Sequence, residues 1–384
     1  RGHIVKRYKN SYTIVLNLGR DPATGRRKQQ WISVKGTKKD AESRLAELLH
    51  QLDTGTFVKP GRTTLGEFLK KWLSDYAKPN LSPRGLERYE SIVRVHLIPS
   101  LGSIILVQLR SEHLQKHYTT KQKEGLNTRT VRYHHVVLHK ALQTAVKWGL
   151  LSRNVADGVD LPRGEHTEMQ TWDEDDITRF LEAAKVTPYY ALFYTALFTG
   201  MRRSELLGLR WADVDFILSQ LYVNRSLHQL NNRSYVFTQP KSVRSRRTIA
   251  LSPSTILTLK RHKEQQALEK AMLGMMLKED DLVFSTPEGK PLRPNTITRA
   301  WANLARRCGL KVIRFHDARH THASLLLKQG VHPKVVQERL GHSSIAVTLD
   351  TYSHVTPGLQ EAAALRFDDA FIVGHNNKAN EKVR

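Results

Sequence analysis

Two short segments rich in proline and glycine divide the chain into three parts, and the hydrophobic pattern changes at the first of them. Residues 55–61 (GTFVKPG) and 161–166 (LPRGEH) have the composition of linkers. Before the first linker, apolar and polar residues alternate as in strands, and after it apolar residues recur every three or four positions as in helices. We therefore predict three domains, at residues 1–60, 64–162 and 168–384, which a chain of 384 residues can accommodate.

The first part predicts a three-stranded antiparallel sheet and one helix. The strands are HIVKRY, SYTIVLNLG and KQQWISV, and Pro22 and Gly25 suit the turn between the last two. Thr37 has the position of a helix cap, and leucines mark one face of the helix that follows. A basic sheet can lie in a DNA groove, although a solvated basic surface remains the alternative. The candidate DNA-binding residues are Lys6, Arg20, Arg26, Arg27 and Lys28.

The second part predicts a compact domain of four or five helices. LGEFLKKWLSDYA follows Thr64 with apolar residues at helical spacing, Pro79 and Pro83 are expected to break this helix, and Ser82 can cap the next. Further helices are expected within residues 111–125 and 127–149. Basic residues on the outer helix faces suit a clamp on one side of a duplex, although such faces are usually only solvated. The candidates are Arg84, Arg88, Arg129, Arg132 and Lys140.

The third part predicts a mixed domain of helices and short strands. Thr171 to Glu174 has the form of a capping box that opens a helix, and residues 189–200 form an apolar helix ending at Gly200. Residues 217–251 predict three short strands, with Lys241 at the tip of the last hairpin. Helices follow again to the C-terminal region. The whole chain is thus predicted to be multidomain and mainly α, with small β elements and an α+β third domain.

The charge of the chain points to a polyanionic partner. Lysine and arginine number 61 against 36 acidic residues, a formal net charge of +25. Because a basic surface releases counterions when it neutralises phosphates, nucleic acid is the leading partner. The single cysteine, Cys308, excludes an intramolecular disulfide and any CxxC zinc or redox pair, and it favours an intracellular location. No apolar run approaches the roughly 18 residues of a membrane span.

Four polar residues near the end of the chain suggest phosphodiester chemistry. His316 and Arg319 stand in an H-x-x-R arrangement, His342 closes a Leu-Gly-His, and Tyr352 lies in TLDTY. Cleavage by a side chain requires a nucleophile, donors for the charge on the phosphoryl oxygens and an acid for the leaving oxygen. Arginines supply planar donors that stay charged. If these side chains meet, they form an anion site beside a phenol that needs no metal.

Together with two earlier motifs, these residues resemble the tyrosine recombinase (phage integrase) family. The further motifs are GMRRSEL, which contains Arg202 and Glu205, and QPKSVRSRRTIAL, which contains Lys241. The pattern spans about residues 170 to 357 and is similar to integrases of temperate phages and conjugative transposons. The resemblance implies an arm-type DNA-binding domain, a helical core-binding (SAM-like) domain and a catalytic domain with a C-terminal tail, in that order.

The resemblance also implies a role for each matched residue. Tyr352 would form a 3′-phosphotyrosyl link and free a 5′-hydroxyl. Arg202 and Arg319 would clamp the phosphate, and Glu205 would orient the site. Arg203 competes for the first arginine position, but the family spacing G-x-R-x-x-E selects Arg202. Lys241 would be the general acid, and His316 would accept the proton of the phenol. His342 would donate a hydrogen bond to the phosphate.

The implied reaction needs no cofactor, metal or ATP, because the phosphotyrosyl link retains the energy of the cleaved bond. The implied partners are double-stranded DNA with arm- and core-type attachment sites and three further copies of the chain. This homotetramer would exchange strands of two duplexes through a Holliday junction, to integrate or excise a mobile element. An excisionase or a DNA-bending protein could assist it. The implied location is the bacterial cytoplasm, on the nucleoid.

Three alternatives compete with this interpretation. His316 and His320 are four apart, as in H-E-x-x-H zinc proteases, but Asp317 stands where that motif needs glutamate. A relaxing topoisomerase of type IB would share the chemistry without needing an arm-type sheet. A DNA-binding regulator that has lost turnover would keep the fold, but all six expected polar positions are occupied.

Overall fold

The computed structural model describes residues 2–20, 25–54, 61–164, 169–239, 246–352, 364, 367 and 368. The chain forms two compact units, residues 1–166 and 167–384, which are described separately. The first unit contains two separate hydrophobic cores, one under the N-terminal sheet and one inside a helical bundle. Among the described helices, none combines the length and apolarity that crossing a bilayer requires.

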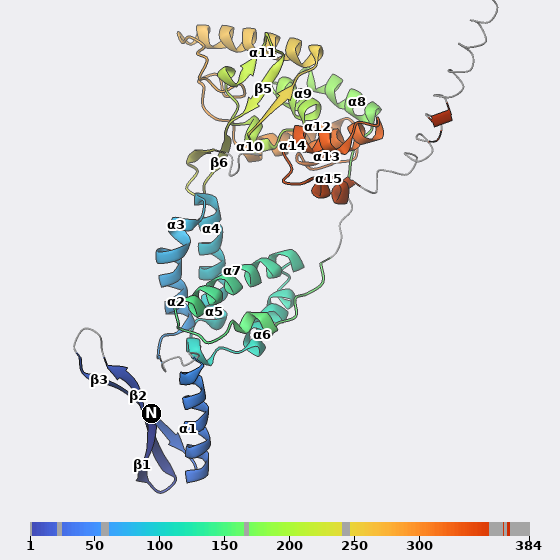
Figure 1. Ribbon diagram of the computed structural model, residues 1–384. Coiled ribbons are helices and arrows are strands. Elements are labelled where there is room, and N and C mark those ends of the chain that lie inside the picture. Colours follow the sequence, from blue (N-terminus) through green and yellow to red (C-terminus); the bar gives the residue numbers. More distant parts are fainter. Residues whose placement is uncertain are drawn as a thin grey trace, which may run out of the picture. The chain divides into compact units, whose positions relative to one another are not determined.

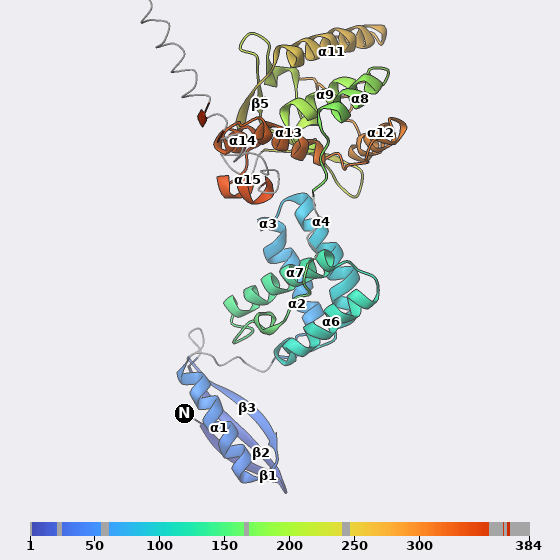
Figure 2. The same cartoon turned by 90° about the vertical axis from the view of Figure 1, so that its right-hand side faces the viewer.

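The N-terminal sheet consists of β1 (Gly2–Tyr8), β2 (Ser11–Arg20) and β3 (Arg27–Lys35), antiparallel in that order. Helix α1 (Lys38–Asp53) lies along one face of the sheet (Figure 2). Ile14 and Leu16 point from the central strand toward this helix and are fully buried against Leu48. The hydroxyl of Thr37 caps the helix. The predicted sheet and helix are confirmed, while Pro22 lies outside the described residues.

The helical bundle forms around Trp72. The indole is fully buried, stacks with Tyr76 and Tyr89 at 5.9 Å in each case, and donates to Thr144 Oγ1 at 3.1 Å. The predicted helices are confirmed, and Ser82 caps α4 as expected. The bundle consists of α2 (Leu65–Trp72), α3 (Lys78–Asn80), α4 (Pro83–Ile92), α5 (Ile98–Leu101), α6 (Ser111–Lys123) and α7 (Thr128–Lys147) (Figure 1).

The helix does not end at Pro79, contrary to expectation, because a π-helical turn precedes the proline. Residues 73–77 form this wider turn, in which the N–H of Lys78 donates to the carbonyl five residues earlier. A proline ring inside a regular α-helix clashes with the carbonyl four residues earlier, and the wider turn relieves that clash. The same arrangement recurs at residues 93–97, directly before Pro99. Each proline therefore lies within a helix that continues past the π turn.

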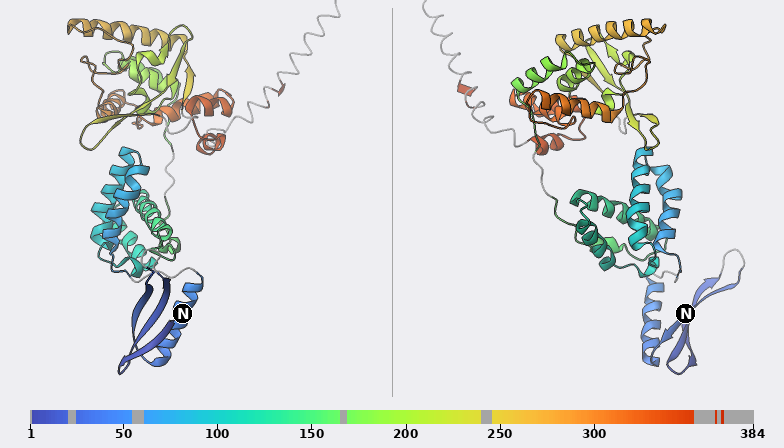
Figure 3. Two further views of the ribbon diagram at one scale, coloured as in Figure 1. Left: turned by 60° about the vertical axis from the view of Figure 1, so that its left-hand side comes forward. Right: turned by 180° about the vertical axis from the view of Figure 1, so that it is seen from behind.

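The second unit is mainly helical, with α9 (Tyr190–Thr199) at its centre against α11 (Pro253–Met272) and α13 (Asp317–Lys328). Its short strands form two sheets, β4-β5-β8 and β6-β7. Helix α11 lies along an outer side of this unit (Figure 3). The elements are α8 (Glu174–Ala184), α9 (Tyr190–Thr199), α10 (Arg203–Leu206), β4 (Val214–Asp215), β5 (Gln220–Val223), β6 (Ser226–Gln229), β7 (Tyr235–Thr238), β8 (Arg247–Ala250), α11 (Pro253–Met272), α12 (Pro294–Arg307), α13 (Asp317–Lys328), α14 (Pro333–Leu340) and α15 (Ile345–Tyr352).

The predicted fold class is confirmed, with two local corrections. In the described part of residues 217–251 there are four short strands instead of three, and between β5 and β6 the guanidinium of Arg225 donates to Gly208 O at 2.7 Å. Helix α8 is capped by Asp173 and not by Thr171. Trp172 must stay extended, since it is buried and stacks on Trp301 at 4.9 Å.

Candidate active site

Two helix ends meet at the centre of the candidate site. Helix α9 ends at Gly200 with φ 64°, and α14 ends at Gly341 with φ 66°. A Cβ on Gly200 would lie 2.7 Å from Leu340 Cδ2, and a Cβ on Gly341 would lie 3.0 Å from Arg247 Cδ. Only glycine therefore suits either position, both for its left-handed backbone and for its close packing.

The side chain of Arg319 joins these two helix ends. Arg319 lies in the first turn of α13 and is 3% exposed. Its Nη1 donates to Gly200 O at 2.8 Å, and its Nη2 donates to Leu340 O at 2.6 Å. Carbonyls at a helix C-terminus lack partners within the helix and carry the negative end of its dipole. They consequently hold the guanidinium in one orientation without neutralising it by a full charge.

Arg202 reaches the same turn from α10. Its Nη2 donates to Gly341 O at 3.3 Å, and its Nη1 and backbone N–H donate to the two carboxylate oxygens of Glu205 at 2.8 and 2.9 Å. The neighbouring Arg203 extends elsewhere, because its Nη1 donates to the hydroxyl of Thr298 on α12. Of the two adjacent arginines, Arg202 is therefore the one directed toward the Gly341 turn.

Glu205 is a buried carboxylate shared by two arginines. Its side chain is 5% exposed, and Arg247 donates to it through Nη2 at 2.9 Å and Nη1 at 3.2 Å. Burial alone would raise the pKa of this carboxyl, but the hydrogen bonds and charges of Arg247 and Arg202 prevail and lower it to about 2. Glu205 is thus ionised at neutral pH. Arg247 was not among the sequence-predicted residues.

The two predicted histidines lie among these arginines. His342 follows the Gly341 turn, and its pKa is lowered to about 4 by burial and by the charges of Arg319 and Arg202. His316, whose surface is open to solvent, directly precedes α13; desolvation of its ring and the charge of Arg319 lower its pKa. Both imidazoles are neutral at pH 7, so each has one donor and one acceptor nitrogen.

Helix α15 is tied to the site through His342. The Nδ1 of His342 lies 2.9 Å from the hydroxyl of Thr348, which is fully buried on α15. Tyr352 is the last residue of this helix, and its side chain is outside the described part of the chain. Lys241 is also outside the described residues. The structure therefore brings together Arg202, Glu205, His316, Arg319 and His342, and leaves the other two predicted residues unplaced.

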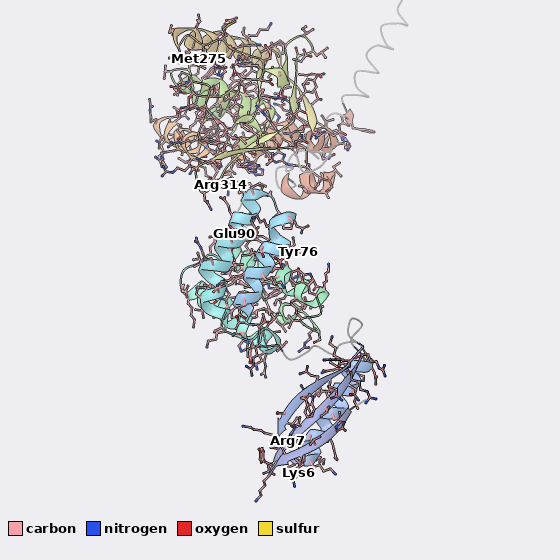
Figure 4. The ribbon with its side chains drawn as sticks, turned by 90° about the vertical axis from the view of Figure 1, so that its left-hand side faces the viewer. Lys6, Arg7, Tyr76, Glu90, Met275 and Arg314 are labelled. Carbon is pink, nitrogen blue, oxygen red and sulfur yellow. The ribbon has the colours of Figure 1, made fainter. Side chains whose placement is uncertain are left out.

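The zinc-protease alternative meets an obstacle at Asp317. Its carboxylate accepts from the backbone N–H of Arg314 at 2.9 Å and from Arg314 Nε and Nη2 at 3.1 Å each, so it is occupied in closing the turn that precedes α13. Figure 4 shows Arg314 at the edge of the unit. His316 and His320 lie edge to face with ring centroids 5.2 Å apart. Within the described ranges, no three metal-ligating side chains are grouped as ligands.

The candidate DNA-binding residues lie on the N-terminal sheet and on the helical bundle. On the sheet they are exposed, as the side chain of Lys6 illustrates in Figure 4. On the bundle, Arg88 lies over the ring of Tyr133 at 3.5 Å, and Arg132 Nη1 donates to Pro162 O at 3.0 Å. The exposed members are Lys6, Arg20, Arg26, Arg27, Lys28, Arg84, Arg88, Arg129 and Arg132, and Lys140 is half-buried.

Comparison with known proteins agrees with this fold. The model of the phage integrase family matches residues 170–358, and that of the phage integrase N-terminal SAM-like domain matches residues 64–122. A "tyrosine recombinase XerC-like" protein of Caldanaerobacter subterraneus subsp. tengcongensis is 30% identical over 96% of this chain and 98% of its own length. The ICEBs1 integrase of Bacillus subtilis is 27% identical, covering 95% of this chain and 99% of its own.

Solved structures share the fold. The Tn1549 transposon integrase in complex with a circular intermediate DNA superposes with a TM-score of 0.68 at 21% identity, over 79% of this chain and 99% of its own. A lambda integrase tetramer bound to a Holliday junction gives 0.57 at 20% identity, over 91% of this chain and 95% of its own. The chain belongs to the phage integrase family of tyrosine recombinases. It is accordingly a site-specific DNA recombinase, an enzyme that cuts and rejoins DNA.

Proposed function

We propose that Arg202 and Arg319 clamp the phosphate that Tyr352 attacks. The observation that supports this is their attachment to consecutive carbonyls of one turn: Arg319 donates to Leu340 O and Arg202 to Gly341 O. Two guanidiniums held on adjacent peptide units present neighbouring donors, which is the geometry that two non-bridging phosphoryl oxygens require. Their fixed charges would stabilise the pentacoordinate phosphorus without movement during the reaction.

The proposed reaction divides the remaining roles among the other residues. The Tyr352 oxygen attacks phosphorus as its proton passes to His316, a 3′-phosphotyrosyl bond forms, and the bond to the 5′ oxygen breaks. Lys241 gives that oxygen its proton, so a 5′-hydroxyl leaves. His342 donates through Nε2–H to the phosphate, because a Thr348 hydroxyl that donates to Nδ1 selects that tautomer. Attack by a second 5′-hydroxyl reverses the step and rejoins the strand.

The proposed biological role is the integration or excision of a mobile element. Residues 1–60 would bind arm-type sites, 64–162 core-type sites, and 168–384 would carry the catalytic site and the tail. The basic side chains named above would contact phosphates. Relatives named as integrases of an integrative element and a transposon support this role, and the lambda integrase tetramer on a Holliday junction supports a homotetramer. An excisionase or DNA-bending protein would set direction, and the enzyme would act on the nucleoid of a bacterial cell.

The decisive test of the proposal is the covalent complex. Covalent protein-DNA complexes captured in cells and sequenced to one base would give the attachment site, and a nicked copy of that site serves as a suicide substrate. Tyr352→Phe should bind this DNA with unchanged affinity and form no adduct. The control Tyr222→Phe changes a tyrosine on β5 and should leave the adduct yield intact. A normal adduct from Tyr352→Phe would refute the assignment of the nucleophile.

A second assay separates recombinase from topoisomerase behaviour. A type IB topoisomerase relaxes supercoils in any plasmid, whereas a recombinase with core-type sites should cleave only DNA that carries them. Relaxation of a plasmid without the mapped site, at a rate equal to that of a plasmid with it, would favour the topoisomerase alternative.

A further inference from the structure

The buried Arg247 has no role in the mechanism above, although it contacts the groups that position both clamp arginines. It begins β8, and its side chain is 5% exposed. Nη2 and Nη1 donate to the two oxygens of Glu205 at 2.9 and 3.2 Å, while Nε donates to Arg339 O at 2.7 Å. One guanidinium thus bonds both the carboxylate that holds Arg202 and the last turn of α14.

We propose that Arg247 is a positioning residue that keeps the charge of Arg202 available to the phosphate by sharing the charge of Glu205. The inference rests on the proposed role of Arg202. Each oxygen of Glu205 accepts one hydrogen bond from Arg202 and one from Arg247. The one negative charge of Glu205 is therefore shared between two positive charges, and the three side chains together keep a net charge of +1.

Without Arg247 the net charge of this group falls from +1 to zero. Glu205 and Arg202 would form a neutral pair, in which the carboxylate is buried and the guanidinium is 36% exposed. The field that Arg202 exerts on a phosphate would be largely cancelled by its own carboxylate partner. A carboxylate this close to the clamp is thus tolerable only because a second arginine offsets it.

The backbone contact of Arg247 gives a competing, purely mechanical explanation. The Arg339 carbonyl lies in the same helix turn as the Leu340 and Gly341 carbonyls that hold the two clamp arginines. Arg339 itself donates to Ala250 O at 2.9 Å and Phe198 O at 3.0 Å, which already fastens α14 to the ends of β8 and α9. Loss of Arg247 could therefore act through shape alone, and the experiment must separate shape from charge.

The experiment compares Arg247→Met with the double variant Arg247→Met/Glu205→Gln. Methionine keeps much of the length and removes the charge, and the second substitution removes the carboxylate that would then cancel Arg202. Single-turnover adduct formation on the suicide substrate should slow by about 100-fold in Arg247→Met, the size of a lost transition-state donor. The double variant should recover by at least about tenfold. A mechanical role predicts the opposite, since the double variant lacks still more contacts.

Arg247→Lys provides a second, gentler comparison, because it retains the charge and loses the paired hydrogen bonds. Charge sharing predicts that it cleaves much faster than Arg247→Met, even if both melt at a lower temperature. The matched control is Arg210→Met. Arg210 pairs with Asp213 in the same capping arrangement as Arg202 with Glu205, and its Nη2 donates to Asp213 Oδ1 at 3.1 Å. This pair lies away from the Gly341 turn. It should lower stability and leave the adduct rate unchanged.

The proposal fails if Arg247→Met cleaves at the wild-type rate, if Arg247→Lys is no faster than Arg247→Met, or if the double variant is no faster than Arg247→Met. Failure of the underlying phosphate clamp has a different signature. In that case Arg202→Met, assayed on the same substrate, would form adduct at the wild-type rate, whatever the Arg247 variants do.

Discussion

Histidines with a lowered pKa occur in both units of the protein, but their neighbours differ. In the helical bundle, His134 is fully buried and its ring lies 4.5 Å from that of His96 and 5.6 Å from that of His117. In the candidate active site, His342 lies among Arg319 and Arg202 instead. Burial is the largest cause of a pKa lowered to about 4 in both His134 and His342.

The difference lies in what could reverse the shift. The His134 ring nitrogens have no hydrogen-bond partner among the described residues, and the remaining causes of its low pKa are other imidazoles and Lys121. At His342 the remaining causes are mainly the charges of Arg319 and Arg202, followed by His320 and Arg247, and a bound phosphate would offset the arginine charges. His134 is thus neutral through the packing of its domain, whereas the pKa of each site histidine is lowered by burial and also by neighbouring arginines.

The largest expected effect comes from removing a clamp arginine. Arg319→Met should reduce the adduct rate by on the order of 1,000-fold, because it removes a charged transition-state donor and its fixed geometry. It also leaves the Gly200 and Leu340 carbonyls without this partner, which should lower the free energy of unfolding by about 1–3 kcal/mol for each. Suicide-substrate kinetics and urea unfolding measure the two effects. A rate within tenfold of wild type would remove Arg319 from the clamp.

The next prediction concerns the histidine pKa values directly. When Tyr352→Phe binds its attachment site, the phosphate should raise the pKa of His342 by about one unit or more, since one unit corresponds to only about 1.4 kcal/mol of interaction. The pKa of His316 should rise as well, and that of His134 should not move. NMR titration of ¹³C-labelled histidine in free and bound protein measures all three. Equal pKa shifts in His342 and His134 would contradict the difference between the two units.

Acid should weaken the bundle through the same histidines. Folded His117 and His134 have pKa values of about 4, against 6.5 for an ordinary imidazole, so the unfolded chain binds these protons first as pH falls. The contribution of these neutral imidazoles to the free energy of unfolding is fully present above pH 6.5. It is lost progressively toward pH 4, by about 2–3 kcal/mol for the first imidazole that becomes charged. Hydrogen exchange in α7 peptides, corrected for its intrinsic pH dependence, measures the loss.

The control for this acid effect lies on the same helix. His134→Phe should reduce the pH dependence of α7, because the fully buried ring no longer titrates, and should leave the share that comes from His117. If His134→Phe retained the wild-type slope, another group would be responsible for the acid sensitivity.

The sequence predicted most of the fold because its helices and strands have clear periodicities. It did not predict the two π turns, since their cause is the fit of a proline ring against a carbonyl of the preceding turn. Motif spacing proposed most of the candidate site, and those roles stay predictions. Arg247 could not be recognised, because it stands in the run SRR beside Arg246, which is exposed and bonds Gln239. Successive residues of a strand point to opposite faces, and only the register decides which one is buried.

The smallest expected effect comes from removing a hydroxyl that contacts an imidazole, and each unit offers such a hydroxyl to compare. Thr348 lies 2.9 Å from His342 Nδ1, and Ser100 lies 2.7 Å from His117 Nδ1. Thr348→Val should slow adduct formation by about 3- to 10-fold, the effect of about 1 kcal/mol, because His342 loses the partner that selects its tautomer. Ser100→Ala should lower the free energy of unfolding by a similar amount and leave the adduct rate unchanged. A cleavage defect in Ser100→Ala would mean that the bundle histidines are coupled to the active site, and the contrast between the two units would have to be abandoned.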